Sequence, residues 1–246
     1  MAVINIDINC DVGEGLQNES ALMPYISSCN IACGGHAGDL ETMKRVILLA
    51  QGNQVKIGAH PGYPDRENFG RKVLDITNQE LKDSIKDQLA VFAAAVKQQN
   101  AQMHHMKPHG ALYNLIADEE DMAHVFLDAV EGYRETPIYL PYLSKIHKAA
   151  LKRGFRFYLE AFADRNYDAN LKLVSRSLDH ALIQEPKKVL LHVLTIIQKE
   201  EVSTIGNIIR SIKADTICVH GDTPSALKIL MYLSKELPKH QVLVSK

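Results

Sequence analysis

The residue types that carry acid–base chemistry are concentrated in a few short clusters of this sequence, each rich in glycine or proline. Three clusters read Cys-Asp-Val-Gly-Glu-Gly around Asp11, Gly-Gly-His-Ala-Gly-Asp around His36, and His-Pro-Gly-Tyr-Pro-Asp from His60. Glycine lets the backbone approach a ligand closely, and imidazoles and carboxylates can move protons or bind metal ions. The clusters are therefore candidates for one active site, provided that the fold brings them together.

Lys107 and His109 stand two positions apart, with Pro108 between them. Alternate side chains of an extended segment share a face, so these two side chains point the same way, and His105 joins them. A lysine and a histidine on one face suit the polarisation of a carbonyl group or the binding of an anion. We predict that Lys107 and His109 take part in catalysis.

Asp7, Asn9 and Asp11 share one face of the first β-type segment by the same alternation. Polar side chains on one face of a buried strand need hydrogen-bond partners or a ligand. Asp11 is a candidate metal ligand, general base or substrate anchor. Capping of the following loop is the structural alternative for Asn9 and Asp11.

A further set of candidates follows two later β-type segments. Asp164 and Arg165 follow one segment, and His220 and Asp222 follow the other. Arg165 can hold a carboxylate or a phosphate through two parallel hydrogen bonds. Helix capping is the alternative role for Asp222 and, in an earlier cluster, for Asp39.

The elements that must position these residues alternate along the chain. Period-two or short apolar patterns predict strands, and 3.6-residue patterns with capping signals predict the helices between them. The expected strands are 3–9, 26–32, 55–59, 102–106, 137–140, 155–160 and 216–219. The expected helices are 40–51, 78–99, 119–131, 142–153, 186–197 and one that begins at Pro224 with Thr223 as its N-cap.

Alternation of strands and helices predicts a parallel sheet. Seven such units without an intervening linker predict one domain over residues 1–246, folded as an irregular seven-stranded (β/α) barrel. An open Rossmann-like sheet is the alternative. In barrels of this class the chemistry lies on the loops that follow the strands, and most of the clusters above fall in those loops. The location of these clusters in the loops after the strands predicts that the protein is an enzyme.

The composition excludes several other classes of protein. The chain has 246 residues with a net charge of −1, which gives no concentrated positive field for nucleic acid or an anionic membrane. No apolar run approaches the roughly 20 residues that span a bilayer, and the N-terminus lacks the features of a signal peptide. We expect a cytoplasmic protein whose four cysteines are reduced and packed. Walker-type phosphate loops and nucleophile elbows are absent from the sequence.

At these clusters the sequence resembles the LamB/YcsF family of lactam-utilisation proteins. The matching segments are 7–15, 28–39, 57–65, 69–71, 107–114, 160–165, 174–176 and 217–224. The resemblance implies a barrel of the glycoside hydrolase/deacetylase type. It also implies a part in ATP-dependent 5-oxoprolinase, which opens 5-oxoproline to glutamate and forms ADP and phosphate. ATP is then a co-substrate, with a divalent metal ion such as Mg²⁺ accompanying it, and subunits B and C are the partners. Gly35 departs from the family pattern, where phenylalanine is expected, and this is expected to loosen one wall of the site.

Together these observations predict the roles of the site residues. Catalytic roles are assigned to Asp11, His60, Lys107 and His109. Substrate binding is assigned to Asn9, His36, Asp39, Asp164, Arg165, His220 and Asp222. In the expected mechanism Asp11 or a neighbouring histidine orients water, Lys107 and His109 stabilise negative charge on the lactam oxygen, and Arg165 holds a carboxylate or phosphate.

Two alternatives remain open at the level of the sequence. The first is a metal-dependent deacetylase in which Asp11, His60 and His109 hold a divalent ion with an open position. The second is a scaffold protein without chemistry of its own, which serves its partners. The sequence is also compatible with assembly into a homo-oligomer.

Overall fold

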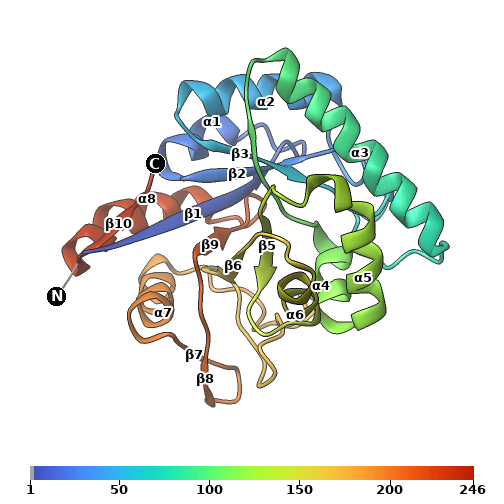
Figure 1. The fold of residues 1–246 in the computed structure, drawn as a ribbon. Coiled ribbons are helices and arrows are strands. Elements are labelled where there is room, and N and C mark those ends of the chain that lie inside the picture. The colour runs from blue at the N-terminus through green and yellow to red at the C-terminus, as the bar shows by residue number, and fades with distance from the viewer. Residues whose placement is uncertain (1–2) are drawn as a thin grey trace.

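The computed structural model describes residues 3–246, and a closed barrel of parallel strands forms its centre (Figure 1). The strands follow one another around the barrel in the order β1, β2, β3, β4, β5, β6, β9, and β9 pairs with β1 to close it. Their bounds are β1 Ile4–Val12, β2 Ser28–Ala32, β3 Lys56–His60, β4 Met103–Met106, β5 Ile138–Pro141, β6 Phe157–Phe162 and β9 Thr216–Val219. The predicted seven-stranded (β/α) barrel is therefore confirmed.

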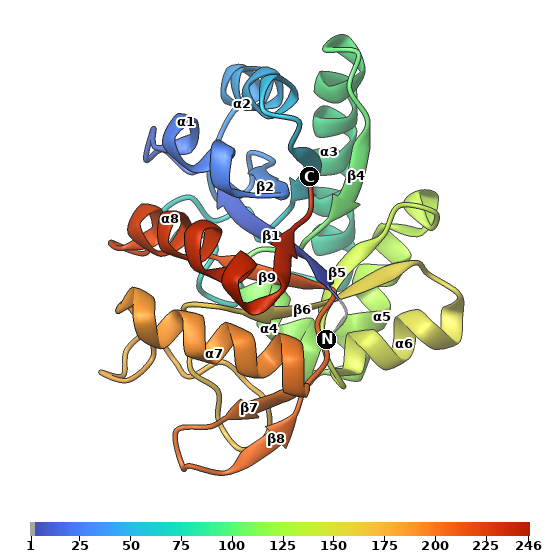
Figure 2. The same ribbon diagram turned by 90° about the vertical axis from the view of Figure 1, so that its left-hand side faces the viewer.

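Helices cover the outside of the barrel (Figure 2). They are α1 Glu19–Leu22, α2 Leu40–Gly52, α3 Asn78–Gln98, α4 Gly110–Asp118, α5 Glu120–Ala129, α6 Lys145–Arg153, α7 Pro186–Lys199 and α8 Ala226–Glu236. Short 3₁₀ turns lie at Met23–Tyr25, Glu131–Tyr133 and Leu237–His240. None of the helices within residues 3–246 is both long enough and apolar enough to cross a bilayer.

Two features lie outside the regular barrel. β10 (Val242–Val244) pairs in parallel with the first residues of β1, next to the strands of the closed ring. β7 (Glu201–Ser203) and β8 (Ile209–Ser211) form an antiparallel hairpin that projects beside α7 (Figure 2). The sequence patterns did not predict either feature, because segments of three residues are too short to show a hydrophobic period.

Local sequence signals explain where the longer helices begin and which face they bury. The Asp39 carboxylate accepts a hydrogen bond from the Thr42 backbone N–H at 2.8 Å and caps α2. Thr77 and Glu80 form a capping box at the start of α3. The apolar faces of these helices join the barrel strands in one continuous core.

One helix was not expected from the sequence, and one expected helix start was wrong. α4 begins at Gly110, directly after the Lys107–His109 cluster, where the sequence predicted a loop. α8 begins at Ala226, and Thr223 is not its N-cap. The Thr223 hydroxyl instead donates a hydrogen bond to the Asp164 carboxylate at 2.5 Å, so a tertiary contact takes the side chain that the local pattern assigned to the helix.

Candidate active site

Most of the predicted residues converge at the C-terminal ends of the barrel strands, around a cavity of about 650 Å³. This volume lies within the usual range for small-molecule sites. The cavity is lined by Asp11, Glu14, His60, Arg71, Lys107, His109, Glu160, Phe162, Arg165, Arg176, His220 and Asp222, among others. All four residues that were predicted to be catalytic therefore line one cavity.

Lys107 lies at the centre of a buried polar group that we call the charged network: Asn9, Asp11, Asn30, Lys107 and Glu160. The Lys107 ammonium is 2.9 Å from Asp11 Oδ1 and 3.0 Å from Glu160 Oε1. It also donates to Cys218 Sγ at 3.0 Å. Three acceptors of this kind fix the position of a cation that is only 2% exposed.

Amide side chains complete the charged network. Asn9 donates to Glu160 Oε1 at 2.9 Å. Asn30 donates to Asn9 Oδ1 and to Asp11 Oδ1, at 2.8 and 2.7 Å. The prediction that Asp7, Asn9 and Asp11 share one face of β1 is confirmed. Asn9 serves the network and does not line the cavity.

Electrostatics within the charged network keep Asp11 and Lys107 ionised. Burial works to raise the pKa of Asp11, but the Lys107 ammonium group outweighs it and holds this pKa well below its usual range. Burial likewise works to lower the pKa of Lys107, and the surrounding Asp11, Cys218 and Glu160 raise it well above the usual value. Burial raises the pKa of Glu160 in spite of the attraction of Lys107.

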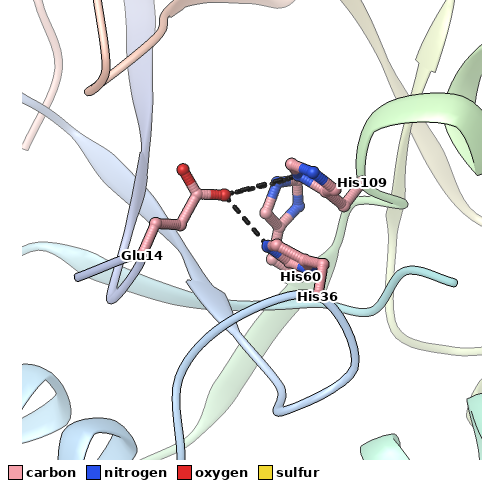
Figure 3. A group of neighbouring side chains, drawn as sticks. All are labelled: Glu14, His36, His60 and His109. Carbon is pink, nitrogen blue, oxygen red and sulfur yellow. Dashed lines mark hydrogen bonds and ion pairs between the residues drawn. The ribbon is translucent and has the colours of Figure 1, made fainter. Parts of the chain in front are cut away.

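A second group, which we call the histidine cluster, consists of Glu14, His36, His60 and His109. Figure 3 shows the Glu14 carboxylate pointing at the three imidazole rings. Glu14 Oε1 lies 3.0 Å from His36 Nε2, 3.4 Å from His109 Nδ1 and 3.8 Å from His60 Nε2. His109 Nδ1 and His60 Nε2 are 3.0 Å apart. The loops after β1, β2 and β4 and the end of β3 thus supply one residue each.

Backbone carbonyl groups fix the tautomers of two of these imidazoles. His60 Nδ1 lies 2.7 Å from the Lys107 carbonyl oxygen, and His109 Nε2 lies 2.9 Å from the Phe69 carbonyl oxygen. A carbonyl oxygen only accepts, so each of these nitrogens carries the N–H. In the neutral rings the other nitrogens, His60 Nε2 and His109 Nδ1, therefore present lone pairs to each other.

Burial keeps the three imidazoles neutral. It lowers the pKa of His36 to about 3 and of His109 to about 4, and it holds the pKa of His60 well below its usual value. Burial also raises the pKa of Glu14 to about 7. At neutral pH the histidine cluster therefore offers imidazole lone pairs to a ligand.

Glycines leave the space that the stacked rings of His36 and His109 occupy. These rings lie parallel, with centroids 3.6 Å apart. A Cβ at Gly70 would lie 2.8 Å from His36 Cβ and 3.0 Å from His109 Cδ2, and Gly70 also has a positive φ of 61°. A side chain at this position would displace the cluster, which explains the glycine in the Phe-Gly-Arg segment.

Gly35 does not loosen the wall of the site as expected. A Cβ at Gly35 would lie 2.5 Å from the side-chain oxygen of Gln88, so that side chain occupies the adjoining space. The Gln88 amide also exchanges hydrogen bonds with the Gly62 backbone, at 3.1 Å to its N–H and 2.8 Å to its carbonyl oxygen. The wall is filled by an amide from α3 that is itself anchored to the loop after β3.

The rim of the cavity carries arginines. Arg71 and Arg176 both form ion pairs with Asp222, and Arg176 Nη1 lies 3.0 Å from Asp222 Oδ2. Arg165 is 6% exposed and donates from Nη2 to the Val174 carbonyl oxygen at 2.6 Å. Its Nε has no hydrogen-bond partner among residues 3–246, so this buried cation retains a free donor.

Asp164 and His220 form a pair at the end of β6 and β9. His220 Nδ1 lies 2.9 Å from Asp164 Oδ1, and the His220 ring stacks on Phe162. Asp164 is fully buried and does not line the cavity, whereas His220 does. The Asp164 carboxylate therefore positions the His220 imidazole. Direct contact with a substrate suits His220 better than Asp164.

The structure does not bring Asp39 to the cavity. This residue is exposed and caps α2. His36 belongs to the histidine cluster but lies behind the residues that line the cavity. Arg165, His220 and Asp222 line the cavity, and their role in substrate binding stays a prediction.

Five residues of the site were not predicted from the sequence, namely Glu14, Asn30, Arg71, Glu160 and Cys218. Glu14 and Arg71 were detectable, because both stand beside glycine in segments that resemble the family pattern. Glu160 is the last residue of the strand expected at 155–160, and Lys107 directly follows the strand expected at 102–106. A charged residue at the end of an expected strand could therefore have identified Glu160 as well. Asn30 and Cys218 lie in apolar segments and carry no local signal. All four cysteines are buried and unpaired within the described chain, as expected.

Comparisons with known proteins agree with this architecture. The sequence model of the LamB/YcsF family matches residues 6–246. The chain is 36% identical to the 5-oxoprolinase A subunit of Pyrococcus furiosus, over 98% of this chain and 97% of the relative. It is 39% identical to the 5-oxoprolinase A subunit of Shouchella clausii, over 97% of both chains.

Solved structures share the fold of this chain. A lactam utilization protein from Thermus thermophilus superposes with a TM-score of 0.92 at 29% identity, over 98% of this chain and 99% of that chain. A putative cellobiose-phosphate cleavage protein from Enterococcus faecalis superposes with a TM-score of 0.62 at 12% identity, over 100% of this chain and 98% of that chain. The second likeness shows a shared fold alone.

Proposed function

This chain belongs to the LamB/YcsF family, and we propose that it is the A subunit of an ATP-dependent 5-oxoprolinase. The complex would open the lactam of 5-oxo-L-proline to L-glutamate, with hydrolysis of ATP to ADP and phosphate. The observation that carries the proposal is the cavity in which an ionised Asp11–Lys107 pair and a buried arginine surround one space. Relatives of nearly equal length carry the name of this enzyme's A subunit.

The chemistry of 5-oxoproline matches the groups that line the cavity. The substrate has a carboxylate and an amide carbonyl group within a five-membered ring. Arg165 is suited to the carboxylate, because its Nε has no hydrogen-bond partner within residues 3–246. Lys107 is suited to the developing negative charge on the lactam oxygen, because neighbouring acceptors hold its ammonium group in place before the reaction.

Asp11 is suited to orient the attacking water. Its Oδ1 accepts hydrogen bonds from Asn30 and Lys107, which fixes the carboxylate. Asp11 lines the cavity, and its Oδ2, which lies 3.6 Å from His60 Nε2, can accept a hydrogen bond from a water molecule there.

The structure favours a role for His109 that differs from the expected one. Its Nε2–H is committed to the Phe69 carbonyl oxygen, and its Nδ1 offers a lone pair. A neutral ring in this tautomer cannot donate a hydrogen bond to an oxyanion from Nδ1. We therefore assign charge stabilisation to Lys107 alone and treat His109 as an acceptor or a ligand.

ATP supplies the driving force in this proposal. An unactivated amide resists hydrolysis, because its resonance must be broken. Transfer of the γ-phosphoryl group of ATP to the lactam oxygen would release ADP. Attack of water on the ring carbon and cleavage of the ring C–N bond would then give an acyl phosphate, and its hydrolysis by a second water would release phosphate and glutamate. ATP, with Mg²⁺, would be the co-substrate, and subunits B and C would complete the site.

A reconstitution experiment tests the proposal. Glutamate and phosphate release from 5-oxoproline and ATP would be measured with the chain alone and with its B and C partners. We expect equal release of both products in the full mixture only. If folded partners and this chain together release neither product, the proposal is wrong.

The histidine cluster favours a metal-dependent hydrolase of the deacetylase type as the second candidate. ATP-independent release of acetate from N-acetyl sugars by the chain alone would support that candidate. The scaffold alternative predicts that the complex keeps full turnover after replacement of the residues that line the cavity.

A further inference from the structure

We propose that Glu14, His60 and His109 form a binding site for one divalent first-row transition-metal ion, with zinc as the best-suited member of this class. The three side chains line the cavity, and Figure 3 shows how they lie relative to one another. The proposal goes beyond lactam opening and does not depend on which substrate the cavity accepts.

The separations of the three donor atoms fit one metal ion. Zinc lies about 2.0–2.2 Å from imidazole nitrogen and carboxylate oxygen, so two of its ligands stand about 3.4 Å apart in a tetrahedral site. The observed separations are 3.0 Å between His60 Nε2 and His109 Nδ1, and 3.4 Å and 3.8 Å from Glu14 Oε1 to the His109 and His60 nitrogens. Small movements of the side chains would bring all three onto one ion.

The hydrogen bonds behind the two imidazoles are those of metal ligands. A ligating histidine usually donates its other ring N–H to a backbone carbonyl group or a carboxylate, which orients the ring. His60 donates to the Lys107 carbonyl oxygen and His109 to the Phe69 carbonyl oxygen. Two lone pairs then face each other across 3.0 Å, an arrangement that is unfavourable until a cation lies between them.

His36 is a positioning residue and does not ligate in this assignment. Its ring is parallel to that of His109, with 2° between the planes and 3.6 Å between the centroids. An imidazole binds a metal ion in the plane of its ring, and two stacked rings cannot both direct an in-plane lone pair at one point. His36 Nε2 lies 3.0 Å from Glu14 Oε1, where its N–H holds the carboxylate toward the other two rings.

The site has room for a further ligand on the cavity side. Glu14, His60 and His109 line the cavity, whereas His36 does not. Two histidines and one carboxylate leave at least one coordination position open, which is typical of catalytic metal sites. Imidazole ligands favour zinc and its first-row neighbours over Mg²⁺. A water molecule or a carbonyl oxygen of a substrate could take the open position beside Asp11.

A second group of potential ligands lies nearby but is less suited to a cation. Asp11, Cys218 and His220 are also close together. The Lys107 ammonium lies 2.9 Å from Asp11 Oδ1 and 3.0 Å from Cys218 Sγ, so this position already holds a positive charge. Repulsion by Lys107 directs a metal ion to the histidine cluster.

Metal binding by the full chain alone tests the assignment. The chain would be stripped with a chelator, and Zn²⁺ binding would be measured by calorimetry and by metal analysis after dialysis. We expect one Zn²⁺ per chain. We expect a loss of affinity of more than about 100-fold in His60→Gln and in His109→Gln, because removing a direct ligand weakens metal binding more than removing a residue that positions a ligand. We expect a loss of about 10- to 100-fold in His36→Ala, and no change in the control His124→Gln on α5.

Substoichiometric Zn²⁺ in the wild-type chain would overturn the proposal, as would equal binding by the His60→Gln and His109→Gln variants. A His36→Ala variant that loses as much affinity as His60→Gln would overturn the choice of ligands. Circular dichroism would verify that each variant is folded.

A measurement without substitutions guards against variants that fail to fold. In the Co²⁺-loaded wild-type chain, the N–H protons of ligating imidazoles show large paramagnetic shifts in the proton NMR spectrum. We expect two such protons, one from His60 and one from His109, and three or none would contradict the assignment. These readouts need neither 5-oxoproline nor ATP, so failure of the metal site and failure of the proposed function are distinguishable.

Discussion

The charged network and the histidine cluster lie side by side at the end of the barrel, but they satisfy their polar atoms in different ways. Lys107 has Asp11, Glu160 and Cys218 as partners within hydrogen-bond distance. In the histidine cluster, the donors of His60 and His109 are used by backbone carbonyl groups, and their acceptor nitrogens face each other. In the charged network the cation is paired with carboxylates of the protein, whereas the histidine cluster is arranged to receive a ligand.

The difference shows how one barrel end can combine fixed charge with an open binding position. Paired charges in a low-dielectric interior are held in place and need no reorganisation during the reaction. An array of neutral lone pairs has no internal cation and can accept one from solution. We therefore assign charge stabilisation to the network and ligand binding to the cluster.

The largest expected effect is on the charged network. Replacement Lys107→Met leaves the buried Asp11 and Glu160 carboxylates without their cation, and the loss of one partner of a buried ion pair costs about 3–5 kcal/mol. We expect a decrease of that size in the free energy of unfolding, measured with urea at pH 7.

Lys56→Met is the matched control, because Lys56 forms a similar pair with Asp7 at 3.3 Å but its side chain is 32% exposed. Exposed pairs contribute under about 1 kcal/mol, so this variant is expected to lose little stability. Equal losses in the two variants would show that the buried network is not held by its lysine.

The histidine cluster is expected to make the chain sensitive to mild acid. The pKa values of His36 and His109 are lowered by burial to about 3 and about 4, below the roughly 6.5 of an unfolded histidine. Stability is then complete above pH 6.5 and is lost as the pH falls toward these folded values, because the unfolded chain binds protons first. Each such proton costs about 1.4 kcal/mol per pH unit.

Glu14 opposes this trend, since burial raises its pKa to about 7 and the folded state then holds one additional proton below that pH. The three imidazoles outnumber this one carboxyl group, so the metal-free chain is expected to lose stability between pH 6.5 and pH 4. Urea unfolding across this range measures the slope. The slope is expected to decrease in His109→Gln and to remain in His124→Gln, and a flat profile for the wild-type chain would contradict the account.

The smallest expected effect concerns an acid that belongs to neither region. Asp39 caps α2 and is exposed. Replacement Asp39→Ala is expected to lower the melting temperature slightly, because one backbone N–H loses its acceptor. Turnover of the reconstituted complex is expected to stay unchanged, and a large loss of turnover would place Asp39 in the site after all.

Much of the fold was predictable because its elements carry strong local signals. The seven strands of the closed barrel and the starts of α2 and α3 follow from apolar periods and capping residues. α4 was missed because it begins at Gly110 with no side-chain cap, inside a cluster rich in glycine and proline. Thr223 was misassigned because its hydroxyl contacts Asp164, which lies 59 residues earlier in the chain.

The site was predictable only as a set of residues at the ends of strands. Lys107, His109 and Asp11 could be recognised by type and position. Their division into two regions could not, because it depends on distances across the barrel and on which ring nitrogen each backbone carbonyl group engages. Asn30 illustrates the limit, since its amide connects the two sides of the charged network from the middle of an apolar strand.

Glutamate formation by a complex that carries an altered copy of this chain tests the central claim, that the lactam is opened in this cavity. Wild-type B and C partners would be combined with the Asp11→Asn variant, and assembly would be verified by gel filtration. We predict that ATP-dependent glutamate release falls by about 100-fold or more, the usual contribution of a group that moves a proton in the transition state. Unchanged release from an intact complex would contradict the claim and would assign the chemistry to the partner subunits.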